Sequence, residues 1–364
     1  MPDKPFSARE FLAKIASAHH GALNYAELAQ KGISPADVLD FSSNVNPFGP
    51  PAGVADALLS ADLIGYPDRE SLSLRRLLAE RHGAGMAQIV VGNGTAELIW
   101  LVCFAFLQAG DVVLQAAPTF GEYARCARLM GAEVVSVWAK ESDGFKPNLG
   151  ELGNAIEEHH PRLVFLCNPN NPTGQFLPGK KVQNLINTFP GTGFVIDEAY
   201  LPFIEDEFSV FSSDHPNLIV LRSLTKDYSL AGMRLGYLAA PQGLADAVAA
   251  ARPAWNVSAL AQTAGEAVLR DESFMRHSVR RLYAAKAELV EGLKGFCYLP
   301  LPSNTPFFMM PVGDAAAFRE RLLLDAHIQV RDCTSFGLPS YVRIAPRSPE
   351  DNQRLLDALA AQKK

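Results

Sequence analysis

Short apolar runs alternate with amphipathic stretches through the first two thirds of the chain. The stretches Leu72–His82, Tyr123–Leu129 and Val182–Phe189 have helical spacing of apolar residues, and they lie between the apolar runs. This order predicts an α/β fold with a mostly parallel seven-stranded sheet and helices on both faces. The predicted strands are 89–92, 111–115, 133–138, 163–167, 194–196, 218–221 and 235–239.

The pattern changes after about residue 250. A long helical region, from Ala259 to about Lys294, precedes short apolar runs at Phe307–Met310 and Tyr341–Ile344. This order predicts a smaller α+β domain at the C-terminal end. The predicted organisation is an N-terminal arm (1–40), a large domain (41–250) and a small domain (251–364).

Composition and charge exclude several classes of function. Nearly half of the residues are hydrophobic, which provides for a sizeable core and excludes a disordered chain. Acidic residues outnumber basic ones, 39 to 33, and no basic cluster exists, so nucleic acid is not the expected partner. The apolar run Leu98–Leu107 is about half of a membrane span, and the opening stretch Phe6–Ile15 is too charged for a signal peptide. We therefore expect a cytoplasmic protein without a membrane partner.

The five cysteines are scattered along the chain, and no pair has CxxC spacing. Neither a disulfide framework nor a zinc site is indicated. No metal is predicted.

Lys226 follows a predicted buried strand, Leu218–Leu221, with hydroxyl residues Ser223 and Thr225 before it and Arg234 after it. Active sites in open α/β sheets lie beyond the carboxyl ends of the strands. An amine next to hydroxyls and a guanidinium suits a Schiff-base lysine beside a bound phosphate. Taken alone, Lys226 would be an ordinary surface lysine; the features below favour the catalytic interpretation.

Two other strand ends carry candidate binding residues. Gly92-Asn-Gly-Thr-Ala-Glu97 opens a predicted helix, where glycines and amide donors can approach a phosphate, although a structural turn explains it equally well. It lacks the third glycine of a dinucleotide fingerprint and the ending of a P-loop. Phe120 could stack on a planar heterocycle, or it could be a core residue.

Two polar segments end the next pair of predicted strands. In Asn168-Pro-Asn-Asn-Pro-Thr-Gly174, two Asn-Pro steps enforce a non-helical loop, from which Asn171 could donate to a phenolate oxygen. Asp197 follows three apolar residues, where a buried carboxylate needs a cationic partner such as a protonated ring nitrogen. Tyr200 could then reach the phenolic oxygen of that ring. A helix N-cap or an Asp-Glu metal pair are the alternatives for Asp197.

Three arginines, Arg331, Arg343 and Arg347, are spaced along the C-terminal part of the chain. A guanidinium on a short strand suits bidentate capture of a carboxylate or phosphate. Arg331 and Arg343 lie among apolar residues, which favours a functional role over a surface ion pair.

Asn-Pro-Thr-Gly, Asp-Glu-Ala-Tyr, Ser-Leu-Thr-Lys and the following Arg234 together resemble the aspartate-aminotransferase-like, fold-type I pyridoxal-phosphate enzymes. These motifs occur in the family's order, and the resemblance covers the chain from about residue 40 to its end. It implies pyridoxal 5'-phosphate as the cofactor, bound by the large domain. It also implies a homodimer with shared active sites.

The resemblance also implies roles for individual residues. Lys226 would hold the cofactor and transfer protons, Asp197 would contact the pyridinium nitrogen, and Asn171 and Tyr200 the phenolic oxygen. Phe120 would stack on the ring. The cofactor phosphate would be bound by Gly94, Thr95, Ala96, Ser223, Thr225, Arg234 and, from the neighbouring subunit, Tyr66, and the substrate by Asn44, Arg331 and Arg343.

Within the family, the chain resembles threonine-phosphate decarboxylases of cobalamin biosynthesis and histidinol-phosphate aminotransferases. The stretches Asp40-Phe-Ser-Ser-Asn-Val-Asn-Pro47, Trp255–Gln262 and Val342–Ser348 are more similar to the decarboxylases. The arm departs from them, because His19-His-Gly-Ala-Leu-Asn24 stands where His-Gly-Gly-Asn is usual.

The predicted function is therefore decarboxylation of a phosphorylated amino acid, with the bond to be broken held perpendicular to the cofactor ring. Transamination of the histidinol-phosphate type is the alternative. A non-catalytic regulator with the same fold is a third, but the chain keeps the reactive lysine and has no added DNA-binding domain.

Overall fold

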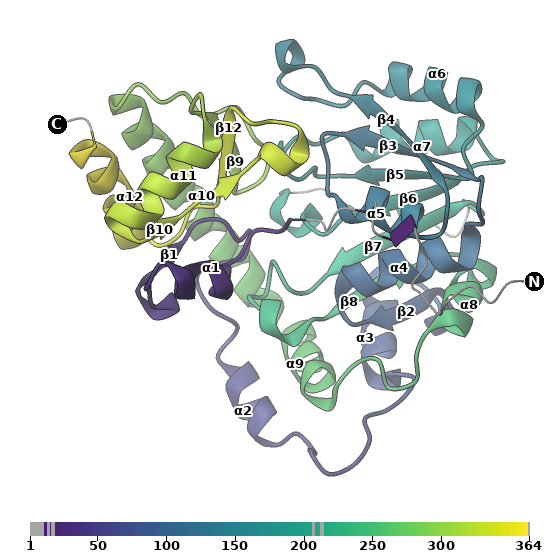
Figure 1. The fold of residues 1–364 in the computed structure, drawn as a ribbon. Coiled ribbons are helices and arrows are strands. Elements are labelled where there is room, and N and C mark those ends of the chain that lie inside the picture. The colour runs from purple at the N-terminus through teal and green to yellow at the C-terminus, as the bar shows by residue number, and fades with distance from the viewer. Residues whose placement is uncertain (1–10, 13–14, 16–18, 206–207, 212–214, 363–364) are drawn as a thin grey trace, which may run out of the picture.

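The structure, a computed structural model, describes residues 11–12, 15, 19–205, 208–211 and 215–362 (Figure 1). The charged stretch Phe6–Ile15, for which the sequence predicts no signal peptide, lies mostly outside the described residues. One large sheet with helices on both faces fills the right of Figure 1, and the C-terminal elements lie at its left.

The large sheet has seven strands in the order β2-β8-β7-β6-β5-β3-β4. All neighbours from β7 to β4 pair in parallel, so the predicted mostly parallel sheet is confirmed. The strands are β2 (Ile89–Gly92), β3 (Val112–Ala117), β4 (Glu133–Trp138), β5 (Leu163–Cys167), β6 (Gly193–Asp197), β7 (Leu218–Ser223) and β8 (Gly236–Ala239).

β8 is antiparallel to both of its neighbours. Only residues 224–235 join β7 to β8, and they contain a single 3-10 turn, Ala231–Met233, instead of an α-helix. A parallel pair is usually joined by a crossover that contains an α-helix, which this connection lacks, and the chain returns beside β7 in the opposite direction. The loop that carries Lys226 therefore leads directly from one central strand to its neighbour.

The two faces of the sheet are buried under different helices. Val113 of β3 belongs to a core shared with α4 and α5, whereas the next residue, Leu114, packs toward α6 and α7. Successive residues of a strand point to opposite faces of the sheet, and here both residues are apolar. This is typical of a sheet that helices cover on both faces. The helices of the large sheet are α3 (Leu72–His82), α4 (Gly94–Phe106), α5 (Glu122–Leu129), α6 (Leu149–His159), α7 (Gly179–Thr188) and α8 (Gln242–Ala251).

The C-terminal part contains a small sheet of order β11-β12-β9, with both pairs antiparallel. The N-terminal segment packs here, because β1 pairs in parallel with β10 through Leu39 and Ile328. The strands are β1 (Leu39–Asp40), β9 (Phe308–Pro311), β10 (Ile328–Gln329), β11 (Arg331–Asp332) and β12 (Tyr341–Ile344). The remaining helices are α1 (Tyr25–Gln30), α2 (Gly53–Leu59), α9 (Ala259–Leu269), α10 (Glu272–Gly295), α11 (Ala315–Ala326) and α12 (Pro349–Ala361).

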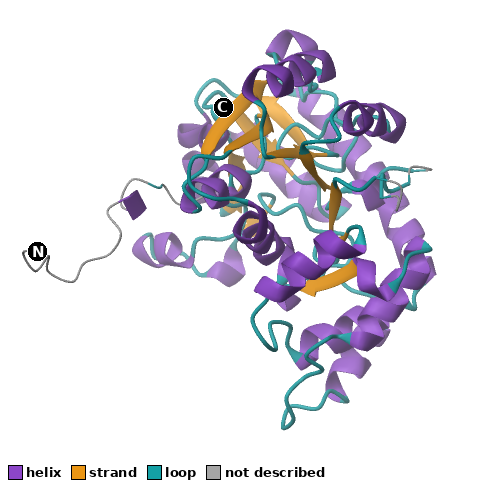
Figure 2. Ribbon diagram, turned by 90° about the vertical axis from the view of Figure 1, so that its right-hand side faces the viewer, coloured by secondary structure: helices purple, strands orange, loops and turns teal. Residues whose placement is uncertain are grey.

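The predicted long helical region after residue 259 consists of two helices, α9 and α10 (Figure 1). Figure 2 shows how helices surround the strands of the molecule. Asp271 separates α9 from α10, since its side chain accepts hydrogen bonds from the amides of Ser273 and Phe274 and so caps the second helix. α9 packs with α3 through Ala264, Val268 and Leu78. The division into an arm, a large domain and a small domain, with boundaries at residues 40 and 250, remains a prediction.

No helix in the described ranges is both long enough and apolar enough to cross a lipid bilayer.

Candidate active site

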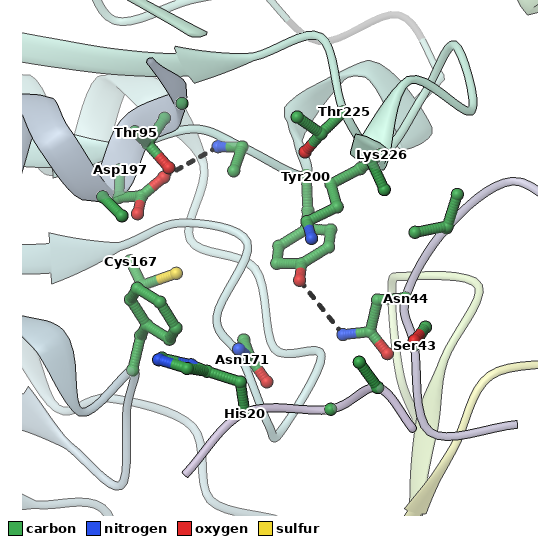
Figure 3. A pocket seen from close by; sticks show the side chains of 18 of the residues that line it. His20, Ser43, Asn44, Thr95, Cys167, Asn171, Asp197, Tyr200, Thr225 and Lys226 are labelled. Atoms are coloured by element: carbon green, nitrogen blue, oxygen red, sulfur yellow. Dashed lines mark hydrogen bonds between the residues drawn. The ribbon is translucent and has the colours of Figure 1, made fainter. Parts of the chain in front are cut away.

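A cavity of about 410 Å³ lies at the carboxyl ends of the central strands (Figure 3). Most of the side chains predicted from the sequence line it, although they come from segments far apart in the chain. They are Asn44, Gly94, Thr95, Ala96, Phe120, Asn171, Asp197, Tyr200, Thr225, Lys226, Arg234 and Arg343.

Asp197 is a buried carboxylate without an ion pair to any described residue. Its Oδ2 accepts a hydrogen bond of 2.6 Å from the hydroxyl of Tyr123, and its Oδ1 accepts one of 3.0 Å from the amide of Ala199. Burial raises the pKa of Asp197, and these two hydrogen bonds oppose the increase. A cationic group in the cavity would stabilise the ionised carboxylate more than either neutral donor does.

Lys226 is partly buried in the loop between β7 and β8 and lines the cavity. Burial lowers the pKa of its amine to about 8, with further lowering by Arg234 and Arg343 and an opposite effect of Asp197. A substantial fraction of the amine is therefore neutral near physiological pH, as a nucleophile or proton acceptor must be.

Tyr200 points its hydroxyl into the cavity, where the side-chain amide of Asn44 donates to it over 3.1 Å (Figure 3). Burial raises the pKa of Tyr200 to about 12, although Arg343 nearby opposes the increase. The phenol is therefore protonated and can donate a hydrogen bond to an oxygen of a bound molecule.

The Asn-Pro loop after β5 uses two of its asparagines internally. Asn168 bonds in both directions with the backbone of Leu177, and Asn170 donates to the carbonyl of Pro118. The side chain of Asn171 lines the cavity and accepts from the guanidinium of Arg343. The structure thus brings the asparagine chosen from the sequence into the site.

The N-terminus of α4 forms one end of the cavity. Gly94 has φ +75°, and a Cβ atom there would lie 2.8 Å from Nη2 of Arg234. Free amides at a helix start and an adjacent guanidinium form a binding site for a phosphate. The hydroxyl of Thr225 lines the same space, and Ser223, which does not line it, bonds to that hydroxyl over 2.7 Å.

Arg343 and Arg331 are both buried and form no ion pair with any described acidic residue. Arg343 donates to Asn171 Oδ1 and to the carbonyl oxygen of Ser42, and its Nε has no partner. Arg331 lies outside the main cavity, in the wall of an adjacent one of about 480 Å³. It donates only to neutral oxygens, including the carbonyl of His19, and its Nε is also without a partner.

Burial lowers the pKa of Arg331 to about 10, with further lowering by the neighbouring Arg343 and an opposite effect of Asp332. Burial also lowers the pKa of Arg343, an effect that Tyr200 and Asp40 oppose. An unpaired buried cation is costly. Two of them side by side, on the paired strands β11 and β12, would suit a molecule with two anionic groups.

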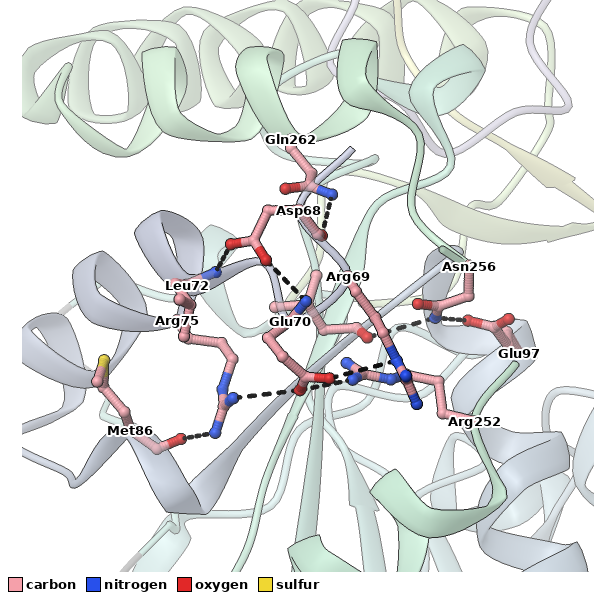
Figure 4. A network of polar contacts seen from close by, with 11 residues as sticks. Asp68, Arg69, Glu70, Leu72, Arg75, Met86, Glu97, Arg252, Asn256 and Gln262 are labelled. Atoms are coloured by element: carbon pink, nitrogen blue, oxygen red, sulfur yellow. Dashed lines mark hydrogen bonds and ion pairs between the residues drawn. The ribbon is translucent and has the colours of Figure 1, made fainter. Parts of the chain in front are cut away.

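Tyr66 does not line the cavity of its own chain. It is 82% exposed, and its ring stacks on that of Trp255 at a centroid distance of 4.6 Å. Hydrogen bonds of Asp68 nevertheless anchor the loop that carries Tyr66 (Figure 4). The carboxylate of Asp68 accepts from the amide of Leu72, and the backbone carbonyl of Asp68 accepts from the side chain of Gln262.

Three residues of the site were missed by the sequence reasoning. Tyr123, whose hydroxyl bonds to Asp197, belongs to α5, and no pattern in the sequence singled it out. The arm supplies His20, whose ring contacts that of Phe120 at 5.3 Å and whose Nε2 bonds to Glu122. Cys167, the last residue of the predicted strand 163–167, also lines the cavity.

The alternative of an Asp-Glu metal pair does not fit the geometry at Asp197. The neighbouring Glu198 points away and pairs with Arg222 at 3.2 Å, as expected for successive residues of a strand. Its Oε1 also accepts from the amide of Val210.

Comparison with known proteins identifies the family. The family model for class I and II aminotransferases matches residues 36–359. The chain belongs to this family. The family assignment confirms the predicted resemblance, the enzyme class and pyridoxal phosphate as cofactor.

Curated relatives include histidinol-phosphate aminotransferases and a protein of cobalamin biosynthesis. A histidinol-phosphate aminotransferase of Thiobacillus denitrificans is 35% identical over 92% of this chain and 88% of its own. The bifunctional adenosylcobalamin biosynthesis protein CobDQ of Leptospira interrogans is 33% identical over 94% of this chain. This chain spans only 40% of the length of that bifunctional protein.

Solved structures of both predicted types share the fold. The L-threonine-O-3-phosphate decarboxylase of Porphyromonas gingivalis superposes with a TM-score of 0.78 at 29% identity, covering 89% of this chain and 99% of its own. The histidinol-phosphate aminotransferase of Sinorhizobium meliloti, in complex with pyridoxal 5'-phosphate, has a TM-score of 0.87 at 24% identity, covering 98% and 99%. At that identity, the second likeness shows the fold alone.

The residues of this family member fit the cofactor. A buried carboxylate without a cation suits the ring nitrogen, and an amine with a lowered pKa suits the aldehyde. The helix start at Gly94, with Arg234 beside it, suits the phosphate.

Proposed function

We propose that this enzyme acts on a phosphorylated amino acid and that its reaction is decarboxylation, as in the threonine-phosphate decarboxylases. The observation that carries the proposal is the pair of buried guanidiniums, Arg331 and Arg343, neither of which has a carboxylate partner among the described residues. A substrate with one carboxylate and one phosphate supplies two anions for them.

We assign Arg343 to the carboxylate, because its guanidinium lines the same cavity as Lys226. Arg331 would bind the phosphate after giving up its bond to the carbonyl of His19. Asn44, which already donates to Tyr200, would contact the substrate from the side of the arm.

Pyridoxal phosphate, when bound, supplies an electron-withdrawing ring that stabilises negative charge at the α-carbon of the substrate. Asp197 would keep the ring nitrogen protonated, and the Tyr123 hydroxyl would hold Asp197 in its ionised form. Phe120 would stack on the ring, and Asn171 and Tyr200 would donate to its phenolic oxygen. Gly94, Thr95, Ala96, Ser223, Thr225 and Arg234 would hold the phosphate.

Lys226 would hold the cofactor before the substrate arrives, and it would protonate the α-carbon after the bond to the carboxylate has broken and CO2 has left. Its lowered pKa supports both tasks, because the neutral amine accepts the proton that the substrate ammonium gives up, and the resulting ammonium donates it to the α-carbon. Arg343 and Arg331 together would fix the orientation of the substrate and so decide which bond at the α-carbon lies perpendicular to the ring.

Transamination of the histidinol-phosphate type is the second candidate, supported by several relatives that carry that name. Histidinol phosphate has a phosphate but no carboxylate, so this donor would occupy only one of the two guanidiniums, whereas the acceptor 2-oxoglutarate, with two carboxylates, would occupy both. Incubation with O-phosphothreonine and, separately, with histidinol phosphate plus 2-oxoglutarate distinguishes the two reactions. Release of CO2 from phosphothreonine is expected; amino transfer from histidinol phosphate without CO2 release would contradict the decarboxylase proposal.

We also propose a homodimer in which Tyr66 of one subunit reaches the cofactor phosphate of the other. Several large apolar side chains are exposed on and near the loop of Tyr66, which projects from the body of the subunit (Figure 1). A contiguous exposed apolar patch is typical of an interaction surface. These side chains are Leu59, Leu63, Ile64, Trp255 and Leu260.

A further inference from the structure

Every polar atom of Asn46 has a hydrogen-bond partner, and most of these partners belong to the loop 224–235 that carries Lys226. The amide of Asn46 donates to the carbonyl of Lys226 over 2.8 Å, and its Nδ2 donates to the carbonyl of Asp227 over 2.9 Å. Its own carbonyl accepts from the hydroxyl of Ser229 over 2.5 Å. The residue is 2% exposed, so water does not compete for these bonds.

The loop needs such a restraint, because it contains a residue in a strained conformation. Ser229 has φ +59°, which side chains other than glycine rarely adopt. Its hydroxyl bond to Asn46 is the side-chain contact that holds it there. A loop that relaxed toward ordinary φ values would carry the preceding residues with it.

The second hydrogen of Nδ2 connects this loop to the C-terminal part of the chain. It is donated over 2.9 Å to the hydroxyl of Ser278, a buried residue of α10. Two positions before Asn46, Asn44 bonds to Tyr200, and the carbonyl of Ser42 accepts from Arg343. The segment Ser42–Asn46 therefore touches the substrate-facing arginine, the phenol and the lysine loop within five residues.

We propose that Asn46 is a positioning residue, which fixes Lys226 relative to Tyr200 and Arg343 and connects it through Ser278 to α10. The inference rests on the proposed role of Lys226. Without the side-chain amide, the carbonyl of Asp227 and the hydroxyl of Ser278 lose their shared donor, and the amine of Lys226 is no longer held at one place in the cavity.

The test compares Asn46→Ala and Asn46→Asp, neither of which can donate from the side chain, with a matched control. Asn352 is similarly buried, at 3%, and its side chain bonds to backbone groups of Ala285 and Arg347, none of which lines the cavity. Asn352→Ala should lower the melting temperature as Asn46→Ala does. Only the Asn46 variants should lower kcat, on the order of 10²-fold with KM nearly unchanged.

A spectroscopic readout separates positioning from general destabilisation. The cofactor-loaded enzyme is titrated with acid and base, and the midpoint of the absorbance change of the bound cofactor is recorded. We expect this midpoint to move in both Asn46 variants, to move less in Ser278→Ala, and to stay at the wild-type pH in Asn352→Ala. Ser278→Ala also serves as the second variant if Asn46→Ala does not fold.

An unchanged midpoint together with an unchanged kcat in the Asn46 variants would overturn the inference. A separate control reports on the proposed role of Lys226: Lys226→Ala should lose the absorbance band that borohydride bleaches in the wild type. If Lys226→Ala kept that band, the proposed function itself would fail, whatever the Asn46 variants do.

Discussion

The hydroxyl of Tyr123 and Oδ2 of Asp197 are 2.6 Å apart, at the point where α5 faces the end of β6. The ring of Tyr123 stacks on Phe165 at 4.9 Å, which restricts its orientation. The phenol therefore acts as a fixed donor to a buried carboxylate, and it stabilises the ionised form against the effect of burial.

Replacing Tyr123 by phenylalanine keeps the stacked ring and removes only this hydrogen bond. We expect the dissociation constant of pyridoxal phosphate to rise roughly ten- to hundredfold, the usual effect of losing a bond to a charged group. Cofactor titration followed by absorbance measures it. Tyr228→Phe is the control, because the hydroxyl of Tyr228 bonds to Arg81 outside the cavity. Equal affinities of Tyr123→Phe and the wild type would contradict the role of this hydrogen bond.

The lowered pKa of Lys226 predicts how attachment of the cofactor depends on pH. Only the neutral amine reacts, so the rate of attachment to cofactor-free protein should rise roughly tenfold per pH unit and level off above about pH 8. Asp197→Asn removes a negative charge that favours the protonated amine, and the plateau should then begin at a lower pH. Stopped-flow absorbance gives both profiles; a plateau only near pH 10 would mean that the amine is not desolvated.

Substitutions of the two buried arginines should affect different classes of substrate. Arg343→Lys should raise KM for every α-amino acid, whereas Arg331→Lys should raise it for phosphorylated ones and leave unphosphorylated analogues unaffected. Loss of a charge-assisted bidentate contact is expected to cost roughly ten- to hundredfold in each case. Arg347→Lys is the control, since Arg347 pairs with Asp351 away from the cavity. Equal effects of the first two variants on both substrate types would refute the assignment.

Two neighbouring residues of the arm should respond in opposite ways to substitution. Ala22 has φ +146°, a conformation suited to glycine, so Ala22→Gly should stabilise the protein by about 1 kcal/mol. A Cβ at Gly21 would lie 2.1 Å from the carbonyl oxygen of Ser42 and 2.8 Å from Nη2 of Arg343, so Gly21→Ala should displace the arm and raise KM. Thermal unfolding and steady-state kinetics test both. A melting temperature of Ala22→Gly below that of the wild type would contradict the inference that the backbone of Ala22 is strained.

The proposed dimer predicts the effect of a charge at Ile64, which is fully exposed in the single chain. Ile64→Asp should shift sedimentation toward the monomer and weaken cofactor binding, because Tyr66 would no longer reach the partner's phosphate. Leu299→Asp, at an apolar residue 68% exposed elsewhere, should do neither. A wild-type protein that sediments as a monomer at micromolar concentration would rule the shared site out.

The order of apolar runs in the sequence was sufficient for the large sheet. Strands buried on both faces need continuous apolar residues, and the runs at Ile89 and Leu163 begin the buried strands β2 and β5 where predicted. The antiparallel direction of β8 and the break at Asp271 were not predicted from the same pattern. Both depend on local details, a short connection and a helix cap, which periodicity does not contain.

Residue types at strand ends also determined most of the candidate site, because parallel strands bring their carboxyl ends to one edge of the sheet. Lys226, Asp197 and Asn171 meet for that reason alone. Only the tertiary structure decided which neighbours hold them. Distant segments make these contacts: Tyr123 bonds to Asp197, Asn46 to the lysine loop, Ser42 to Arg343 and His19 to Arg331. Their geometry follows from the packing of the whole chain, which no local sequence pattern contains.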